Sequence, residues 1–432
     1  MLRLIRTGAL ACIAGLAATA SISTPVSSPV AAQDNVGAVI KNYADIAHAG
    51  YEDSLMTAKT LHTALKAFVA SPSAATMATA RGAWLTARMP YQQTEVFRFG
   101  NAIVDDWEGR VNAWPLDEGL IDYVKSDLYG TESNENKLYV ANVIANPTLT
   151  SGGKKIDASQ ITKRLLQKEL HEAGGVEANV ATGYHAIEFL LWGQDLNVTG
   201  PGAGTRPHTD FSATNCTGGN CARRAAYLLT STELLIDDLR EITAAWAPGG
   251  EARTAVMSKG RNGLTNIITG MGSLSYGELA GERMKLGLLL HDPEEEHDCF
   301  SDNTHNSHYY DAKGIRNVYL GRYNRVDGRV VQGASLADLV KAAAPAVHTD
   351  MVRHLDKTMD AMNVIVRSAE DGMAYDQLIG EGNAAGNAKI QAAIDALTAQ
   401  TRVIEKMTVS LELSQIAFEG SDSLDDPKAV FK

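Results

Sequence analysis

The stretch GYHAIEFLLWGQD (Gly183–Asp195) places one histidine and one glutamate in an otherwise apolar segment. On an α-helix, His185 and Glu188 share a face, with Cβ atoms about 5–6 Å apart. The neighbouring residues are apolar on every side, which is typical of a buried helix. Because glutamate is almost never buried without a partner, this pair needs an explanation.

Two interpretations compete for the pair. In the first, Glu188 forms a buried ion pair with an arginine such as Arg98 or Arg283, and His185 hydrogen-bonds nearby. In the second, the imidazole and the carboxylate are two ligands of one metal ion, as in helical bundles with carboxylate metal sites. Histidine and carboxylate together suit ferrous iron. Spacing alone does not choose between the two.

The size and charge of the chain limit its class. A chain of 432 residues is too long for one ordinary core, which predicts two domains or a doubled one. Apolar residues at 45% and charged residues at 21% indicate a folded globular protein. The net charge of −12 argues against a nucleic-acid partner, because phosphate contacts need clustered Lys and Arg. Acidity suits the attraction of cations, but it also keeps proteins soluble.

The N-terminus has the pattern of a secretory signal peptide. Arg3 and Arg6 precede an apolar run at 8–20, and a Ser/Pro-rich stretch ends in small residues at Ala32. The run is too short to span a bilayer. We therefore expect residues 1–32 to be removed on export, which leaves a net charge of −14 because no acid is lost.

Three cysteines follow the predicted cleavage site. Cys216 and Cys221 flank a Thr-Gly-Gly-Asn turn, and pairing is the default in an exported protein. A thiolate metal site with His208 is the alternative, but the spacing is not that of zinc knuckles. We predict a Cys216–Cys221 disulfide, with Cys299 left over.

The chain reads as helix nearly everywhere, and no sustained two-residue alternation predicts strands. Three long segments without helical periodicity are usually functional in compact domains; they are 100–123, 197–221 and 292–329. The predicted helices are 35–70, 74–97 (capped by Ser73 and kinked at Pro90), 159–171, 176–192, 222–246, 251–290, 335–370 and 385–418.

The first and third irregular segments resemble each other. FRFGN (Phe97–Asn101) leads to LDEGLIDY (Leu116–Tyr123), and CFSDN (Cys299–Asn303) leads to YDAKGIRNVY (Tyr310–Tyr319). This similarity indicates an internal duplication, with chance similarity as the alternative. We place the two helical halves at 33–250 and 251–432 and expect a site at their junction.

Common hydrolase motifs are absent. HEAGG (His171–Gly175) begins like a zinc-protease motif, but a glycine replaces the second histidine. The sequence has neither a Gly-x-Ser-x-Gly elbow nor a phosphate-binding loop.

The opening stretch contains a Gly-x-His-x-x-Glu signature and resembles the imelysin family, classed as M75 peptidases. ARGAWLTARMPYQQTEVFRFG (Ala80–Gly100) and VNAWPLDEGLIDY (Val111–Tyr123) are similar to other segments of that family. EEEHDCFSDNTHNSHYYDAKGIRNVYLG (Glu294–Gly321) is similar to its long branch, often called iron-regulated protein A. The resemblance covers most of the chain. It implies an all-α, two-domain helical-bundle architecture with pseudo-twofold related halves and the signature at the interdomain cleft.

The resemblance also suggests site residues. It assigns the signature to Gly183, His185 and Glu188, of which the last two are the candidate metal ligands. It implies a cleft lined by further candidates, which are Glu95, Arg98, Trp114, Asp117 and Glu282. A second cluster, Glu295, His297 and Asp298, with His305 and His308 following, either adds metal ligands or is a solvated turn.

We therefore expect an exported protein, periplasmic or outer-membrane-associated, that binds a divalent metal or iron through the Gly-x-His-x-x-Glu motif. Components of an iron-uptake system are the expected partners, and we expect no transmembrane helix in the mature chain. The alternative is an M75-type metallopeptidase in which His185 and Glu188 hold a zinc ion whose bound water attacks a peptide bond, with another carboxylate as base. Glu188 is then the candidate catalytic residue. A third interpretation is an interaction module in which the signature is purely structural.

Overall fold

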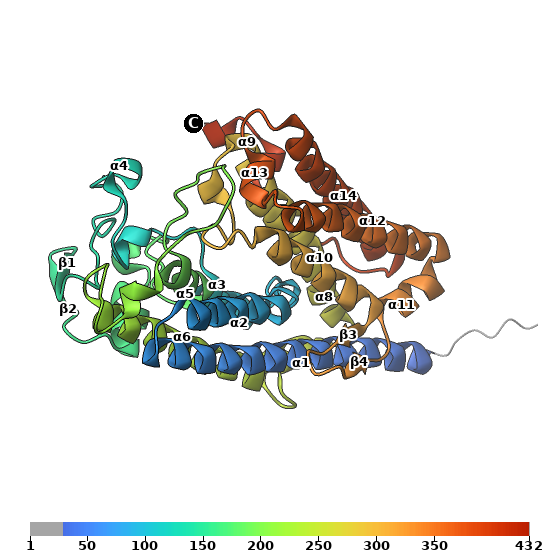
Figure 1. The fold of residues 1–432 in the computed structure, drawn as a ribbon. Coiled ribbons are helices and arrows are strands. Elements are labelled where there is room, and N and C mark those ends of the chain that lie inside the picture. Colours follow the sequence, from blue (N-terminus) through green and yellow to red (C-terminus); the bar gives the residue numbers. More distant parts are fainter. Residues whose placement is uncertain (1–28, 432) are drawn as a thin grey trace, which may run out of the picture.

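The computed structural model describes residues 29–431, with side chains from residue 35 onward, and it is almost entirely helical (Figure 1). The all-α prediction is therefore confirmed. The predicted signal peptide falls almost wholly on residues 1–28, which lie outside the described part. None of the described helices is both long and apolar enough to cross a membrane.

The N-terminal part is built on the 42-residue helix α1 (Pro29–Ala70), along which α2 (Ala74–Gln92) and α6 (Cys221–Trp246) pack (Figure 1). Ser73 caps α2 as predicted, because its hydroxyl accepts from the Thr76 N–H while the Thr76 hydroxyl accepts from the Ser73 N–H. The signature helix α5 (Gly183–Trp192) contacts both α2 and α6. The signature therefore lies in the interior of the bundle.

The C-terminal part centres on the paired helices α12 (Pro345–Glu370) and α14 (Ala384–Ser410), which lie side by side (Figure 1). The π-helix η7 (Leu274–Lys285) packs against α14. Helix α10 (Thr304–Leu320) contacts both α12 and α2, so it joins the two parts. A single cluster of buried apolar residues runs through both parts.

The remaining elements are short. The further α-helices are α3 (Ala102–Asn112), α4 (Ser126–Tyr129), α7 (Glu251–Met257), α8 (Gly263–Ser273), α9 (Leu286–Leu290), α11 (Leu336–Ala343), α13 (Tyr375–Ile379) and α15 (Asp422–Asp425). The 3-10 and π segments are η1 (Glu95–Phe97), η2 (Glu118–Leu120), η3 (Leu165–Leu170), η4 (Ala173–Gly175), η5 (His208–Phe211), η6 (Gly260–Asn262), η8 (Pro293–Glu295) and η9 (Ala429–Phe431).

Two of the three segments predicted to be irregular contain a helix. Helix α3 lies within 100–123 and α10 within 292–329. The buried face of α10 includes the polar residues Ser307, His308 and Asp311, so hydrophobic periodicity is masked there. Conversely, the helix predicted at 159–171 reduces to a short stretch that ends in the six-residue π-helix η3.

Two short antiparallel hairpins were not predicted. Strands β1 (Thr148–Ser151) and β2 (Lys154–Asp157) join through two glycines with φ of +55° and +76°, which a two-residue hairpin turn favours. Strands β3 (Arg322–Asn324) and β4 (Val330–Gln332) form the second hairpin. Strands of three or four residues are too short to show alternation in the sequence.

The cysteine prediction is confirmed. Cys216 and Cys221 form a disulfide that ties the first residue of α6 to the preceding loop, and Cys299 is free.

Candidate metal centre

Helix α5 holds His185 and Glu188 in the interior, at 1% and 0% exposure. The helix begins at Gly183, whose φ of +82° and close approach to the Val111 backbone leave no room for a Cβ. This start replaces the predicted one at residue 176. One turn into the helix, His185 Nδ1 lies 3.1 Å from Glu188 Oε2.

Within residues 35–431, Glu188 forms no ion pair with an arginine. Its Oε1 accepts hydrogen bonds from the Ser301 N–H at 3.0 Å and from the Ser301 hydroxyl at 2.6 Å. Arg98 and Arg283 bind other carboxylates, so the interpretation of a Glu188 ion pair with either of them is wrong. Burial, and after it the charge of Asp298, raises the pKa of Glu188 well above its usual value.

The loop between α9 and α10 brings His297 and Asp298 to the same place. The rings of His185 and His297 are 4.8 Å apart, and Asp298 Oδ1 lies 3.9 Å from His185 Nδ1 and 3.8 Å from His297 Nδ1. One ligand atom from each of these three buried residues lies within 4.8 Å of the other two. The signature pair and part of the predicted second cluster thus meet in one group of side chains.

The imidazoles are in the form that binds metals. Burial lowers the pKa of His185 to about 3 and that of His297 well below its usual value. Both rings are therefore neutral at physiological pH, and a neutral ring keeps one nitrogen lone pair for a ligand. His185 Nε2 is buried and makes no hydrogen bond.

A buried arginine that sequence analysis did not single out orients the carboxylate. Arg88, on α2, donates to Asp298 Oδ1 at 2.7 Å and to Asn112 Oδ1 at 2.6 Å. Gln92, one turn further, has its amide nitrogen 3.2 Å from His297 Nδ1. Arg88 and Gln92 are polar residues one helical turn apart on the buried face of α2. His185 and Glu188 form the same kind of pattern on α5, so the sequence pattern could have identified this pair too.

The second oxygen of Asp298 is also held. Asp298 Oδ2 accepts from the Asn303 side chain at 2.8 Å and from the Ser307 hydroxyl at 2.5 Å. Hydrogen bonds of this kind fix the orientation of a ligating carboxylate. The carboxylate is positioned by helices α2 and α10 together.

Trp114 and Asp117 lie on the side of the site that opens to a cavity. The Trp114 ring meets the His297 ring edge-on at 5.7 Å. Trp114 and Asp117 line a cavity of about 420 Å³. Glu118 lines the same cavity, and burial, followed by the charge of Glu294, raises its pKa to about 8. Asp195, Asp292 and Glu294 line the cavity as well, so it is rich in acidic residues, and Trp114 connects it to the buried histidines.

Glu95 and Arg98 belong to a neighbouring network of buried charges. Glu95 Oε2 accepts from Arg283 at 2.6 Å, while Arg98 lies 3.6 Å from Glu108 and 3.5 Å from Glu278. Burial raises the pKa of Glu108 to about 7. These groups neutralise one another, and none is among the three residues whose ligand atoms converge.

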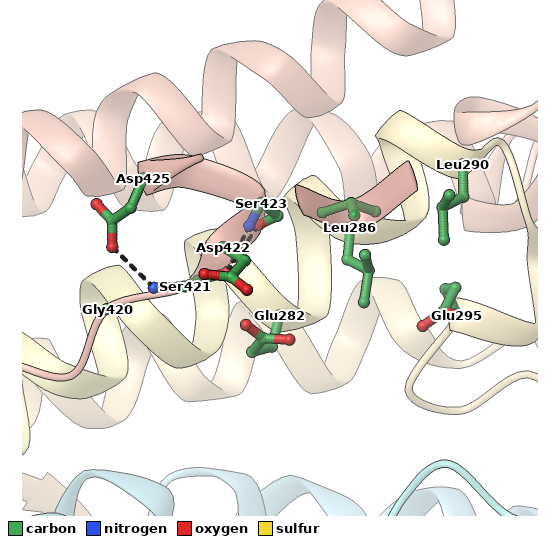
Figure 2. Close-up of a pocket in the computed structure, with 10 residues that line it drawn as sticks. Glu282, Leu286, Leu290, Glu295, Gly420, Ser421, Asp422, Ser423 and Asp425 are labelled. Carbon is green, nitrogen blue, oxygen red and sulfur yellow. Dashed lines mark hydrogen bonds between the residues drawn. The ribbon is translucent and has the colours of Figure 1, made fainter. Parts of the chain in front are cut away.

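Glu282 and Glu295 lie elsewhere. Both line a hollow of about 690 Å³ between η7, α9 and the C-terminal segment 420–425, as Figure 2 shows. The structure thus separates Glu295 from His297 and Asp298, although they are close in sequence. His308 is buried against the Tyr375 ring at 5.0 Å, and its ring nitrogens make no hydrogen bond.

The sequence model of the imelysin family, peptidase M75, matches residues 47–404. The chain belongs to the imelysin family. Iron-regulated protein A of Synechococcus elongatus is 24% identical over 354 residues, which are 81% of this chain and 79% of that protein.

Two crystal structures share the fold of this imelysin-family protein. An iron-regulated protein A precursor from Parabacteroides distasonis superposes with a TM-score of 0.62 at 20% identity, covering 88% of this chain and 95% of that one. An imelysin-like protein from Psychrobacter arcticum gives 0.56 at 15% identity, covering 89% and 98%.

Proposed function

We propose that this imelysin-family protein is exported and binds a divalent metal ion, iron in its cellular role, at His185, His297 and Asp298. The observation that supports this most directly is the approach of three buried potential ligands to within 4.8 Å of one another. Relatives named iron-regulated protein A connect the family with iron.

The donor set fits such an ion. Two neutral imidazoles and a carboxylate suit iron, zinc or manganese, and the second carboxylate of Glu188 lies beside them. With both acids ionised and Arg88 charged, the protein groups sum to one negative charge, which a divalent ion more than neutralises. The ion would supply a bond between α5 and the 292–303 loop.

The acidic cavity beside Trp114 supports the same proposal. A concave surface with one sign of charge concentrates ions of the other sign. Its wall reaches Trp114, whose ring touches that of His297. We propose this cavity as the path by which the ion enters, delivered by components of an iron-uptake system.

Metal binding by substituted proteins tests the proposal. Equilibrium dialysis of the full chain against Fe²⁺ and Zn²⁺, under reducing conditions, should give one tightly bound ion per chain. His185→Ala with Glu188→Ala, and separately His297→Ala, should weaken binding at least tenfold, because each removes a donor from a small set.

His305→Ala is the matched control, since this histidine lies in the same region but outside the converging group. It should bind as the unsubstituted protein does. Equal uptake by the control and by folded His185→Ala/Glu188→Ala protein would end the proposal.

The peptidase alternative stays a prediction. His185, Glu188, His297 and Asp298 are all almost fully buried, which favours binding of an ion over access by a polypeptide. Incubation with an unstructured polypeptide, with and without chelator, distinguishes the two. Chelator-sensitive cleavage that Glu188→Gln abolishes would favour the peptidase.

A further inference from the structure

A second group of carboxylates lies close to the histidine site without any cationic partner. Asp195, Glu294, Glu296 and Asp376 line one small cavity. Among the described residues, none of the four forms an ion pair with lysine, arginine or histidine. Several fully buried acids elsewhere differ in this respect; Asp53, Glu95, Asp122 and Asp298 all pair with arginines.

Glu296 and Asp376 are the most buried of the group, at 1% and 2% exposure. All four of their carboxylate oxygens are buried, and within the described part of the chain no hydrogen bond of ordinary geometry reaches them. Burial raises the pKa of both carboxyls, and the nearby Thr304 hydroxyl and Gln377 N–H offset only part of that effect through weak hydrogen bonding. Carboxylates buried to this degree without an ion pair are strongly unfavourable in their ionised form, and a bound cation would stabilise that form.

The cavity has the size of a single ion. Its volume is about 10 Å³, close to the room that one water molecule or metal ion needs. Its walls come from three places in the fold, since Asp195 follows α5, Glu294 and Glu296 lie on the 292–303 loop, and Asp376 is on α13. An organic ligand does not fit, and ligands that are all oxygen suit a hard cation.

From these observations we infer a site for a hard divalent cation, Ca²⁺ in particular, formed by Glu296 and Asp376 with Asp195 and Glu294. The ion would connect the end of the signature helix with α13. As they stand, no three of these carboxylates bring ligand atoms within 4.8 Å of one another, as expected of like charges without a cation between them. Side-chain rotation would close the set, and water and backbone carbonyls would complete the six to eight ligands that Ca²⁺ takes.

This site differs chemically from the histidine site and does not depend on it. The calcium response of the full chain, freed of metal with chelator, tests it by thermal unfolding. An ion that binds only the folded state raises the melting temperature in a saturable way. We expect that rise in the unsubstituted protein.

Glu296→Gln removes one buried charge. We expect it to melt above the unsubstituted protein in chelator and to respond to Ca²⁺ with at least tenfold weaker apparent affinity, as Asp376→Asn should. Glu295→Gln is the matched control, because that neighbour lines a different hollow, and it should keep the full response (Figure 2).

Two further measurements make the outcome decisive. Tb³⁺ bound at the site should luminesce on excitation of Tyr375, and Ca²⁺ should displace it. Burial, and after it the nearby charge of Glu296, raises the pKa of Tyr375. The His185→Ala/His297→Ala protein should keep the calcium response, which separates this inference from the proposed function. An equal calcium response in Glu296→Gln, or no saturable response in the unsubstituted protein, would overturn the inference.

Discussion

Many buried carboxylates in this protein form ion pairs with buried arginines. Asp122 is the clearest example. Its carboxylate accepts from Arg206 at 2.7 Å and from Arg224 at 2.6 Å and 2.9 Å, and all three side chains are buried. A pair of this kind contributes little net stability, but losing one partner leaves an uncompensated charge.

Asp122→Asn should therefore lower the free energy of unfolding by about 3–5 kcal/mol, because two buried guanidiniums lose their main counter-charge. Urea denaturation measures the change. Asp127→Asn is the control, since Asp127 only forms a solvent-exposed pair with Lys125 at 3.7 Å, and its effect should stay within about 1 kcal/mol. Similar losses in both proteins would contradict this account.

At the scale of helices, local signals located some boundaries well and others poorly. Ser73 marks the start of α2, and the glycines and proline at 248–250 mark the end of α6. The start of α5 was misplaced by seven residues, because Val180 and Ala181 are buried although they lie in the irregular segment before Gly183. Apolar content alone does not separate a buried helix from a buried extended chain.

Ser73→Ala should cost about 1 kcal/mol, because it removes the acceptor for the Thr76 N–H at the first turn of α2. Chemical denaturation measures the loss. Ser71→Ala, two residues earlier on the exposed surface, should leave stability unchanged. If both substitutions lowered the free energy of unfolding equally, the capping box would not be the reason for the loss.

The whole molecule buries more acids than it can pair, and this affects its response to pH. Burial raises the pKa of Glu118 to about 8 and that of Glu108 to about 7, so the folded state keeps protons that the unfolded state releases. Burial lowers the pKa of His185, His297 and His308, so these residues make the free energy of unfolding rise with pH. That rise is nearly complete once the pH exceeds the pKa of about 6.5 that histidine has in the unfolded state.

In chelator, the free energy of unfolding should therefore fall as the pH rises from about 6.5 to 8. Each proton that only the folded state retains contributes up to about 1.4 kcal/mol per pH unit. Glu118→Gln should flatten this slope, because the amide does not titrate, whereas Glu177→Gln on the surface should not. Denaturant titrations at several pH values provide the measurement, and stability that rises over this range would contradict the assignment.

The amino-acid sequence alone was enough to predict the all-helical class, the Cys216–Cys221 disulfide, and that His185 and Glu188 need polar partners in the protein interior. These three predictions depend on residue spacing, helix capping and apolar patterning, which can be recognised within one short segment of the sequence. The identity of those partners depends on the tertiary structure. Ser301 hydrogen-bonds to Glu188 although it lies 113 residues away in sequence, and Arg88 hydrogen-bonds to Asp298 across 210 residues. Such long-range partners are set by how the helices pack. Packing also separates Glu295 from His297, although only one residue lies between them. The reason is that neighbouring side chains on an irregular loop point into different cavities.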